Sequence, residues 1–387
     1  MNKKKDLELY IHIPFCIRKC KYCDFNSGPE TKEVINIYYH NLLTEIENYG
    51  NGNFPIWDYQ VKTVFIGGGT PTSIDSSYIK GIMDKVNEVF SLLPKDEIEI
   101  TIEANPGTLT KEKLAMYRSL GINRLSLGLQ SANNEELKLL GRIHTMEVFL
   151  ENYRLARACG FDNINIDLMS ALPGQTLDSW KDTLTQVLEL NPEHISAYSL
   201  IIEEGTPFYD TYENHEELLP DEDTEREMYR VTKQMLFKAG YIRYEISNYA
   251  KEGYHCQHNL GYWERVPYLG LGVSAASLFE NERFKNPSTH VGYHNYVTKN
   301  NTGRDIQVLN EKTQMEEFMF LGLRKMKGVS KKEFAQTFWI PLKEVYKEVI
   351  EELVKDKLLE ENQNDIYLTE RGIDISNYVL AKFLLEE

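Results

Sequence analysis

The first predicted strand runs directly into a cysteine-rich loop: Leu7-Glu8-Leu9-Tyr10-Ile11-His12-Ile13-Pro14-Phe15-Cys16-Ile17-Arg18-Lys19-Cys20-Lys21-Tyr22-Cys23. Within the apolar run, Tyr10 and His12 alternate with apolar neighbours, as expected of a β-strand with two different faces. Three thiols follow in the spacing C-x3-C-x2-C. A strand that ends in chemically active side chains is typical of parallel α/β folds, whose sites lie at the carboxyl ends of strands.

The three clustered cysteines indicate a metal site. Three thiolates can hold a [4Fe–4S] cluster and leave one iron free to bind a substrate. Zinc is an alternative, but a structural zinc site needs four ligands, and His12, the obvious fourth, lies on the strand. Inert thiols are a second alternative, whereas the size of the chain and its cysteine-poor remainder disfavour a disulfide framework. We expect Cys16, Cys20 and Cys23 to ligate such a cluster.

Composition narrows the class of protein. The 387 residues leave room for one large domain and a smaller one. The 43 basic and 59 acidic residues give a net charge of −16, which argues against nucleic acid or an anionic membrane as the main partner. No apolar stretch approaches the roughly 20 residues of a membrane span. Five cysteines, three of them clustered, fit a reducing cytoplasm.

Strand-like and helix-like segments alternate along the first two thirds of the chain. The predicted strands are 7–15, 61–67, 97–104, 124–130, 163–171 and 194–202. The predicted helices are 32–49, 76–93, 110–119, 146–158 and 176–190. This repetition predicts a parallel sheet with right-handed crossovers, either an open partial barrel or a doubly wound sheet.

The alternation inside the strands favours the barrel. In 97–104 the isoleucines point one way, and Glu99 and Glu103 point the other. Strands covered by helices on both faces should be apolar throughout. A polar face that recurs in four strands instead indicates a wet or ligand-filled interior, with Glu103, Gln130 and Asp167 at or near the carboxyl ends. We therefore predict an α/β fold with a partial (β/α)6 TIM-like barrel.

The second strand ends in Gly67-Gly68-Gly69-Thr70-Pro71. Glycines let the backbone approach a ligand closely or adopt positive φ, and Pro71 restricts Thr70 to extended geometry. Amides exposed there could bind an amino-acid-like ligand, although a glycine run alone is more often a turn. The run is not a phosphate loop, because the Lys-Ser/Thr that would complete one is absent.

Together, these motifs resemble the radical S-adenosylmethionine enzymes, in one branch that contains the coproporphyrinogen III dehydrogenases and the HemW heme chaperones. The matching segments are Tyr10–Cys16, Ile102–Pro106, Ser126–Ser131, Leu140–Thr145 and Asn165–Met169. The resemblance implies that the free iron binds the amino and carboxylate groups of S-adenosylmethionine. An electron from the cluster would then cleave the sulfonium to a 5′-deoxyadenosyl radical.

The resemblance also implies cofactor contacts, residue by residue. Those expected at the first S-adenosylmethionine are Tyr10, Gly68, Glu103, Gln130, Arg142 and Asp167. Gly69 and Thr70 match positions that face a second S-adenosylmethionine in the dehydrogenase, and Tyr22 is a further expected contact. Arg142 suits a bidentate carboxylate contact, while Gln130 and Asp167 can take ribose hydroxyls.

Two departures favour the chaperones over the dehydrogenase. Phe25 stands where the dehydrogenase has a fourth cysteine, and only 15 residues precede Cys16, where the dehydrogenase has a long segment. The expected function is a heme chaperone that delivers heme to acceptors such as respiratory enzymes. The alternative is oxygen-independent coproporphyrinogen III dehydrogenase, a decarboxylase of heme biosynthesis. A homodimer is left open.

A second motif, His255-Cys256-Gln257-His258-Asn259-Leu260-Gly261-Tyr262-Trp263, contains the H-N-x-x-Y-W pattern that resembles the heme site of the chaperones. We expect His258 to ligate heme iron, with Cys256 and His255 as lesser candidates. If strand alternation held here, His258 and Cys256 would share one face. The alternative is a structural corner. Cys159, at the end of a predicted helix, is expected to be a small buried residue.

The C-terminal part is predicted to be helical. A capping box, Ser330-Lys331-Lys332-Glu333, begins one helix, and a hairpin-like 358–368 precedes the last. This pattern is typical of a winged-helix unit, but six basic and eight acidic residues in 330–361 give no basic stripe for DNA. The expected domains are the barrel at 1–240, a connecting region with the heme motif at 241–310, and the C-terminal domain at 311–387.

Overall fold

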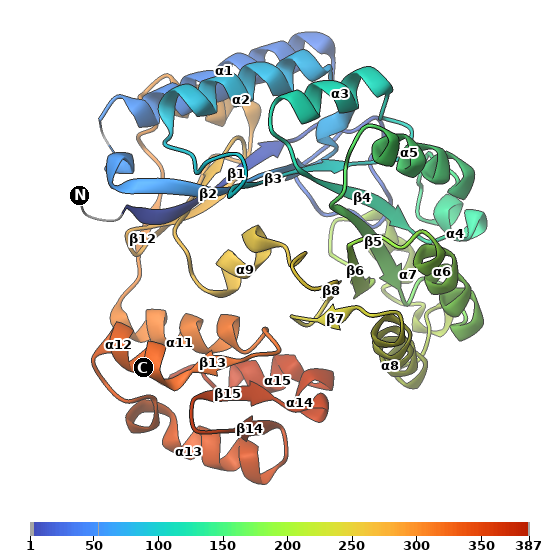
Figure 1. Cartoon of the computed structure of the whole chain (residues 1–387), viewed down its shortest axis with the longest axis vertical. Helices are drawn as coiled ribbons and strands as arrows, with labels where there is room; N and C mark the ends of the chain where they lie inside the picture. The colour runs from blue at the N-terminus through green and yellow to red at the C-terminus, as the bar shows by residue number, and fades with distance from the viewer. Residues whose placement is uncertain (1–3, 53, 386–387) are drawn as a thin grey trace.

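Six parallel strands form the framework of the protein, which is described here by a computed structural model covering residues 4–52 and 54–385. They lie side by side in chain order and curve into an open arc (Figure 1). The strands are β1 (Lys5–Ile13), β2 (Tyr59–Gly68), β3 (Glu99–Ala104), β4 (Arg124–Gln130), β5 (Ile164–Ser170) and β6 (His194–Ser199). Each overlaps a predicted strand, and the predicted partial barrel is confirmed.

Helices cover the convex face of the arc (Figure 1). They are α1 (Lys32–Gly50), α2 (Ser76–Val89), α3 (Lys111–Ser119), α4 (Asn134–Leu139), α5 (Met146–Ala158), α6 (Leu177–Glu189) and α8 (Glu222–Lys238). The short helix α7 (Pro207–Tyr212) instead contacts the cysteine loop, where Phe208 N donates to Lys21 O at 3.0 Å. Local sequence sets where several begin: the side chains of Thr31, Thr110 and Thr176 accept hydrogen bonds from backbone N–H groups in the first turns of α1, α3 and α6.

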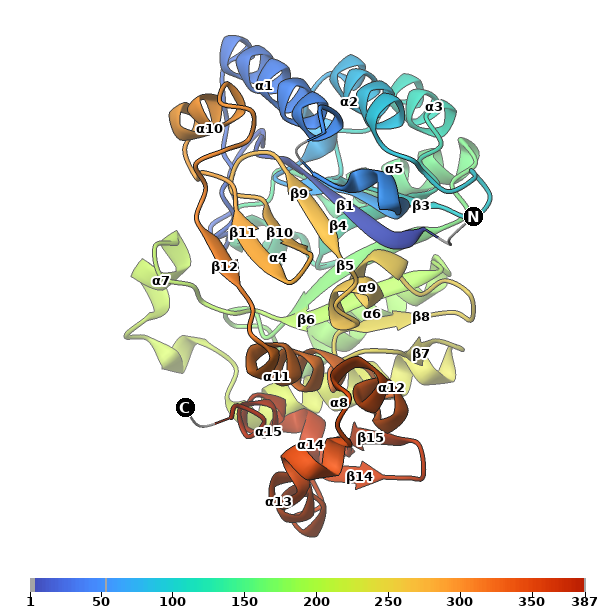
Figure 2. The ribbon, with the colours of Figure 1, turned by 90° about the vertical axis from the view of Figure 1, so that its left-hand side faces the viewer.

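The segment after α8 extends the sheet at both edges. Its elements are β7 (Ile242–Arg243), β8 (Asn248–Ala250), α9 (Gln257–Trp263), β9 (Tyr268–Leu271), β10 (Ala276–Phe279), β11 (Glu282–Lys285), α10 (His290–Val297) and β12 (Ile306–Val308). The described residues form a 12-stranded sheet in which β9 pairs in parallel with β1 and β8 pairs antiparallel with β6. The helix α9 lies on the concave side of the arc (Figures 1 and 2).

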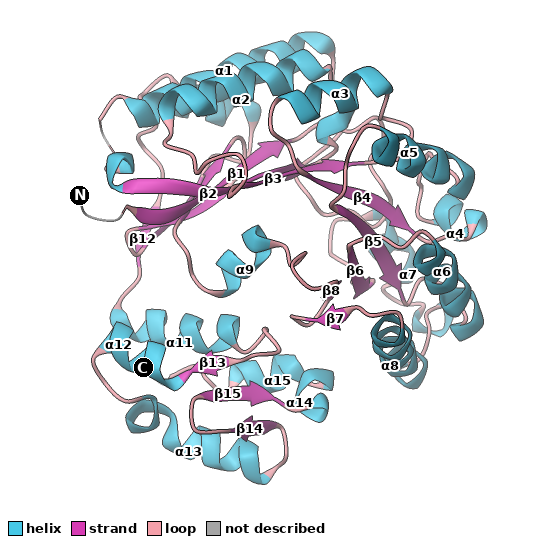
Figure 3. Ribbon diagram, viewed as in Figure 1, coloured by secondary structure: helices cyan, strands magenta, loops and turns pink. Residues whose placement is uncertain are grey.

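The C-terminal part packs around a core of its own. It consists of α11 (Glu311–Gly322), β13 (Val329–Ser330), α12 (Lys331–Phe338), α13 (Leu342–Lys355), β14 (Leu359–Glu361), β15 (Asp365–Leu368), α14 (Glu370–Asp374) and α15 (Ser376–Ala381). Its strands form a small antiparallel sheet in the order β13-β15-β14 (Figure 3). Ser330 caps α12 as expected, and β14 and β15 are the expected hairpin. The exact domain bounds stay a prediction.

The strands bury an apolar face against the helices and a polar face in the interior. Leu9, Ile11 and Ile13 belong to the main core. On the opposite face, polar side chains are buried as well, and they satisfy one another: Asn165 donates to Ser126 Oγ at 2.8 Å and pairs with His194 Nδ1 at 2.6 Å. The predicted polar interior is therefore present. It can be buried because polar groups that bond one another avoid most of the cost of losing their contacts with water.

No helix in the described part of the chain is long and apolar enough to cross a membrane.

A buried carboxylate ties the edge strand β9 to the helical layer. Glu45 on α1 accepts hydrogen bonds from Gly272 N at 2.7 Å, Asn286 Nδ2 at 2.6 Å and Tyr293 Oη at 2.5 Å. Burial raises the pKa of Glu45 to about 7. Three donors from one distant segment thus converge on a single side chain.

Replacing Glu45 with alanine should therefore destabilise the protein strongly. Three buried donors would lose their acceptor, and we expect the free energy of unfolding to fall by about 3 kcal/mol or more. Urea titration followed by circular dichroism measures this change. The matched control is Glu47→Ala on the exposed face of the same helix, expected to change stability by less than about 0.5 kcal/mol. Equal effects of the two substitutions would contradict this role for Glu45.

Candidate functional site

The cysteine loop leaves the sheet at a point fixed by backbone hydrogen bonds. Gly69 N donates to Ile13 O at 2.9 Å, and Thr70 N donates to Phe15 O at 2.7 Å. At Gly69 a Cβ would lie 2.7 Å from Phe15 O and 3.0 Å from Cys16 Sγ, closer than side-chain carbons approach in proteins. The absence of a side chain at Gly69, directly after β2, is thus required by close packing against the loop.

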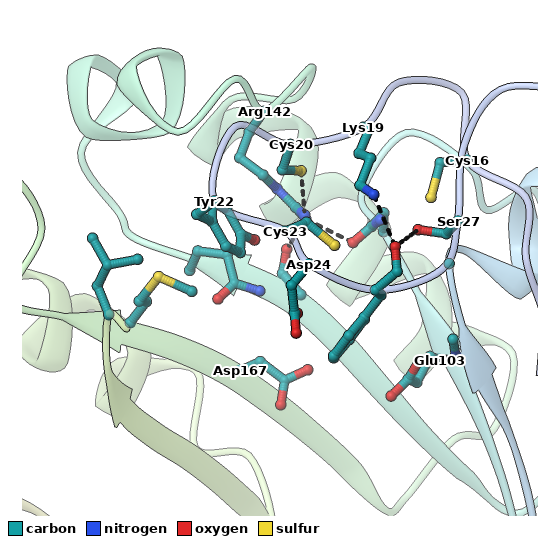
Figure 4. Close-up of a pocket in the computed structure, with 18 of the residues that line it drawn as sticks. Cys16, Lys19, Cys20, Tyr22, Cys23, Asp24, Ser27, Glu103, Arg142 and Asp167 are labelled. Carbon is teal, nitrogen blue, oxygen red and sulfur yellow. Dashed lines mark hydrogen bonds between the residues drawn. The ribbon is translucent and has the colours of Figure 1, made fainter. Parts of the chain in front are cut away.

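The three loop thiols are free, partly buried and border one cavity of about 340 Å³ at the carboxyl ends of the strands (Figure 4). Among the described residues, no group of three or more His, Cys, Asp or Glu side chains is gathered around a point that a single metal ion could occupy. A space bordered by three thiols suits a multi-iron cluster in its donor chemistry.

Most of the expected cofactor residues meet at this cavity. Those that border it with the cysteines are Tyr22, Gly68, Gly69, Glu103, Gln130, Arg142 and Asp167. The other three, Tyr10, Thr70 and His258, are not among its lining residues. Tyr10 and Thr70 lie at the edges of the cavity, and His258 lies deeper in the barrel interior on α9.

Arg142 reaches the loop from the turn after α4. It donates through Nη1 to Cys20 Sγ at 3.5 Å, through Nη2 to Asn105 Oδ1 at 2.6 Å, and also to Gly128 O. Its Nε–H is buried without a partner. Arg142 therefore places a positive charge beside a cysteine sulfur and keeps one donor for a further acceptor.

Two carboxyl groups face each other across the cavity floor (Figure 4). Glu103 accepts from Gly68 N at 3.0 Å, and Asp167 accepts from Ser126 Oγ at 3.0 Å and Asn165 Nδ2 at 2.7 Å. Burial, and then the charge of Asp167, raise the pKa of Glu103 to about 8. Burial also raises the pKa of Asp167. Two acidic groups held this way favour a cationic ligand, whose charge would lower both pKa values.

Gln130 ends β4 in the left-handed region, with φ of 73°. Only a few per cent of non-glycine residues adopt this conformation. Its Oε1 accepts from Tyr198 Oη at 3.1 Å. The interpretation from sequence missed Tyr198 and Asn105. Asn105 directly follows the predicted strand 97–104, a signal that could have identified it, whereas Tyr198 lies in the middle of the predicted strand 194–202 and only the observed β6 places it near a carboxyl end.

Tyr10 and Thr70 support the site from its edges. The partly exposed Tyr10 shares a hydrogen bond with His12 Nδ1 at 3.0 Å, and its ring stacks on Phe65 at 6.3 Å between centroids. Thr70 is 2% exposed, accepts from Asn105 Nδ2 at 2.6 Å and lies 3.6 Å from Cys16 Sγ. Thr70 therefore braces the cysteine loop.

The H-N-x-x-Y-W motif lies lower in the barrel interior, on α9. His258 is 1% exposed, and both ring nitrogens are bonded: Nδ1 to Thr63 Oγ1 at 2.7 Å and Nε2 to Tyr262 Oη at 2.9 Å. Burial lowers the pKa of His258 to about 3, so the ring is neutral. Ligation of iron by His258 would require one of these two bonds to break.

The two lesser heme candidates are also engaged. Cys256 is fully buried, contacts Glu99 Oε1 at 3.6 Å, and has a pKa raised by burial. His255 stacks on Tyr244 at 4.5 Å. The expectation that alternation puts Cys256 and His258 on one face is wrong, because His258 belongs to a helix that Cys256 precedes as the N-cap. Cys159, expected to be buried, is partly exposed at the end of α5.

Comparisons with known proteins find relatives over nearly the whole chain. A model of the radical SAM superfamily matches residues 10–187, and one of the HemN C-terminal domain matches residues 309–375. The heme chaperone HemW of Bacillus subtilis is 37% identical over 97% of this chain and 99% of its own length. HemW of Escherichia coli is 42% identical over 71% of each chain.

Among solved structures, coproporphyrinogen III oxidase (HemN) from Escherichia coli, a radical SAM enzyme, superimposes with a TM-score of 0.84. The match covers 98% of this chain and 90% of that one at 24% identity. At this level of identity the likeness concerns the fold.

One buried acid beneath the cavity lacks hydrogen bonds altogether. Both carboxyl oxygens of Glu8 are without a partner, and Oε2 lies 3.8 Å from His258 Nδ1. Burial, opposed by the charge of Lys62, raises the pKa of Glu8 to about 9. The folded protein thus holds the Glu8 proton up to about pH 9, whereas the unfolded chain releases it near pH 4.5, so stability falls as the pH rises between these values.

Replacing Glu8 with glutamine should remove this loss. The stability of Glu8→Gln relative to the original protein should increase from pH 6 to pH 9, with a slope of at most about 1.4 kcal/mol per pH unit. Urea unfolding at a series of pH values measures it. The control Glu97→Gln, at an exposed site before β3, should follow the original curve. A constant difference between Glu8→Gln and the original protein would contradict the raised pKa.

Proposed function

The chain belongs to the radical S-adenosylmethionine superfamily and, within it, to the HemW heme chaperones, and from this membership we propose that it binds heme and delivers it to acceptor proteins. The observation that carries the proposal is the match to curated heme chaperones over nearly the whole chain. Membership of the superfamily also brings the [4Fe–4S] cluster and S-adenosylmethionine as cofactors.

Cys16, Cys20 and Cys23 are proposed to hold three irons of the cluster. Their position supports this, since all three thiols are free and border one cavity. When bound, the cluster supplies an electron to the S-adenosylmethionine sulfonium and offers its fourth iron to the methionine end. Arg142 would orient the Cys20 sulfur, and its unpaired Nε–H would be available to the methionine carboxylate.

The remaining contacts follow from charge and position. S-adenosylmethionine carries an ammonium and a sulfonium, which suit a cavity floored by Glu103 and Asp167. Tyr10, Tyr22, Gln130 and the backbone of Gly68 would complete the site. A second S-adenosylmethionine at Gly69 and Thr70 stays a prediction, and its Thr70 contact requires the buried hydroxyl to leave Asn105.

Heme is proposed as the cargo, and its axial ligand stays a prediction. Ligation by His258 requires α9 to give up the bond from Tyr262 or Thr63. The acceptors proposed are heme proteins such as respiratory enzymes, and the proposed location is the cytoplasm. The homodimer is likewise a proposal.

The second candidate function is coproporphyrinogen III dehydrogenase. Its support is the shared fold. Against it, Phe25 borders the cavity with 57% of its surface exposed, at the position where the dehydrogenase pattern has a fourth cysteine. An exposed aromatic ring cannot provide that thiol.

Loss of one loop cysteine should abolish the cluster. After anaerobic reconstitution, the original protein should hold about four irons per chain with broad iron–sulfur absorption. Cys20→Ala should lose both, since two thiolates cannot hold the cluster. The matched control is Cys159→Ala, a partly buried free cysteine away from the cavity, which should keep full iron content. A Cys20→Ala protein with four irons would refute the assignment.

The two candidate functions predict opposite results in a paired assay. The purified, reconstituted chain should shift the Soret band of added heme with saturable binding, and should form no protoporphyrinogen IX from coproporphyrinogen III with dithionite and S-adenosylmethionine. Chromatographic porphyrin analysis and heme titration measure the two activities. Sustained decarboxylation would establish the dehydrogenase, and the absence of saturable heme binding would overturn the chaperone.

A further inference from the structure

The two nitrogens of the His258 ring face different parts of the protein. Nδ1 bonds Thr63 Oγ1 at 2.7 Å, and Thr63 belongs to β2 of the barrel wall. Nε2 bonds Tyr262 Oη at 2.9 Å, and Tyr262 lies on α9 itself, four residues further along the helix. A metal ion binds an imidazole through one nitrogen, and the hydrogen bond at the other nitrogen sets the tautomer. The surroundings of the two nitrogens therefore decide which one can reach iron.

The Nδ1 side of the ring is closed by the barrel wall. Thr63 is fully buried, and so is Glu8 of the neighbouring strand β1, whose Oε2 lies 3.8 Å from Nδ1. Glu8 and Thr63 are direct partners in the parallel pairing of β1 with β2. An iron bound to Nδ1 would therefore require two paired strands in the middle of the sheet to separate.

The Nε2 side is closed by a side chain of α9. Tyr262 is partly exposed, and its ring meets the His258 ring edge to face, with 4.8 Å between centroids and 71° between planes. Turning this side chain away breaks one hydrogen bond and leaves the sheet intact. A heme that approaches Nε2 thus displaces side chains of α9 and not the strands of the barrel.

We propose that Nε2 of His258 is the atom that binds heme iron, that the Tyr262 hydroxyl takes its place in the heme-free protein, and that Thr63 is a positioning residue for the ring. The inference rests on the proposed function, in which heme is the cargo and His258 is the expected ligand. It extends that function by assigning the ligating atom and by giving the two hydroxyls opposite effects on heme binding.

The bond to Thr63 favours ligation through Nε2. A neutral imidazole has one N–H group and one lone pair. When Nε2 gives its lone pair to iron, the proton is on Nδ1, and the hydroxyl oxygen of Thr63 accepts a hydrogen bond from it. Partners of this kind fix the orientation of a ligating histidine and raise its basicity, and their loss typically lowers metal affinity by roughly 10- to 100-fold.

The bond to Tyr262 opposes ligation through Nε2. Its hydroxyl occupies the position in the ring plane from which iron would approach, so the bond must break before heme binds. Only the fraction of molecules in which Nε2 is free is competent to bind, and the apparent affinity for heme is reduced by that fraction. Removing the hydroxyl should therefore strengthen heme binding.

The test removes each hydroxyl separately and retains most of the side-chain shape. Thr63→Val removes the acceptor at Nδ1, and Tyr262→Phe removes the competitor at Nε2. The matched control is Thr185→Val, at an exposed threonine of α6 whose hydroxyl bonds Lys181 O of the same helix. Each full-length reconstituted protein is titrated with hemin and followed by Soret absorption, and circular dichroism checks folding.

We expect Thr63→Val to weaken hemin binding by roughly 10-fold and Tyr262→Phe to strengthen it by roughly 3-fold. Thr185→Val should match the original protein. Thr63→Ser, which restores the hydroxyl, should recover the affinity to within roughly 3-fold of the original. The midpoint potential of the bound heme should rise in Thr63→Val and not in Thr63→Ser, because an imidazole without its Nδ1 hydrogen bond donates less strongly to iron.

Three results would overturn the proposal. Weaker hemin binding in both Thr63→Val and Tyr262→Phe would mean that the two bonds hold α9 in place and do nothing more. Stronger binding in Thr63→Val with weaker binding in Tyr262→Phe would make Nδ1 the ligating atom. An unchanged heme spectrum in His258→Ala would exclude the histidine as ligand and leave the proposed function standing.

If Thr63→Val does not fold, Tyr262→Phe decides the question, and an affinity equal to or below that of the original protein contradicts the proposal. The original protein is titrated before any variant. Absence of saturable hemin binding there would count against the proposed function itself, which separates that failure from a wrong assignment of the ligating atom.

Discussion

Two backbone hydrogen bonds, from Gly69 N to Ile13 O and from Thr70 N to Phe15 O, fix the point where the cysteine loop leaves the sheet. They are possible only because Gly69 has no side chain. With this contact in place, the thiols stand over the carboxyl ends of the strands, and the side chains of β3, β4 and β5 form the floor beneath them. The position of the cysteine loop relative to this floor depends on the junction between β1 and β2.

A polar barrel interior costs folding free energy unless its buried donors and acceptors form hydrogen bonds. In the lower half of the barrel, Asn165 forms hydrogen bonds with Ser126 and His194. The first turn of α9 donates backbone hydrogen bonds to the carboxylate of Glu99. The upper half leaves Arg142 Nε unbonded and raises the pKa values of Glu103 and Asp167. Apart from Glu8, the polar groups named here in the lower half are bonded, whereas the upper half leaves a free donor beside two acidic groups, where the cofactor is proposed to bind.

The sequence predicts what local pattern determines. The spacing of the cysteines, the alternation in β3 and the cap at Ser330 each depend on a few neighbouring residues, and the structure contains all three features. Placing α9 requires tertiary information, since a helix of seven residues with no apolar stripe gives little periodic signal. The same limit applies to Thr70: the sequence places it after the second strand, and only its contact with Cys16 Sγ shows that the hydroxyl faces the loop. The three partners of Glu45 lie more than 200 residues further along the chain, beyond any local pattern.

The central claim is that S-adenosylmethionine binds at the cavity bordered by the three thiols, in contact with an iron that no residue ligates. Electron paramagnetic resonance of the dithionite-reduced protein tests it most directly, because the g-values of a [4Fe–4S] cluster respond to its ligands. The account predicts that saturating S-adenosylmethionine changes the spectrum of the reduced cluster. Superimposable spectra with and without S-adenosylmethionine would contradict it.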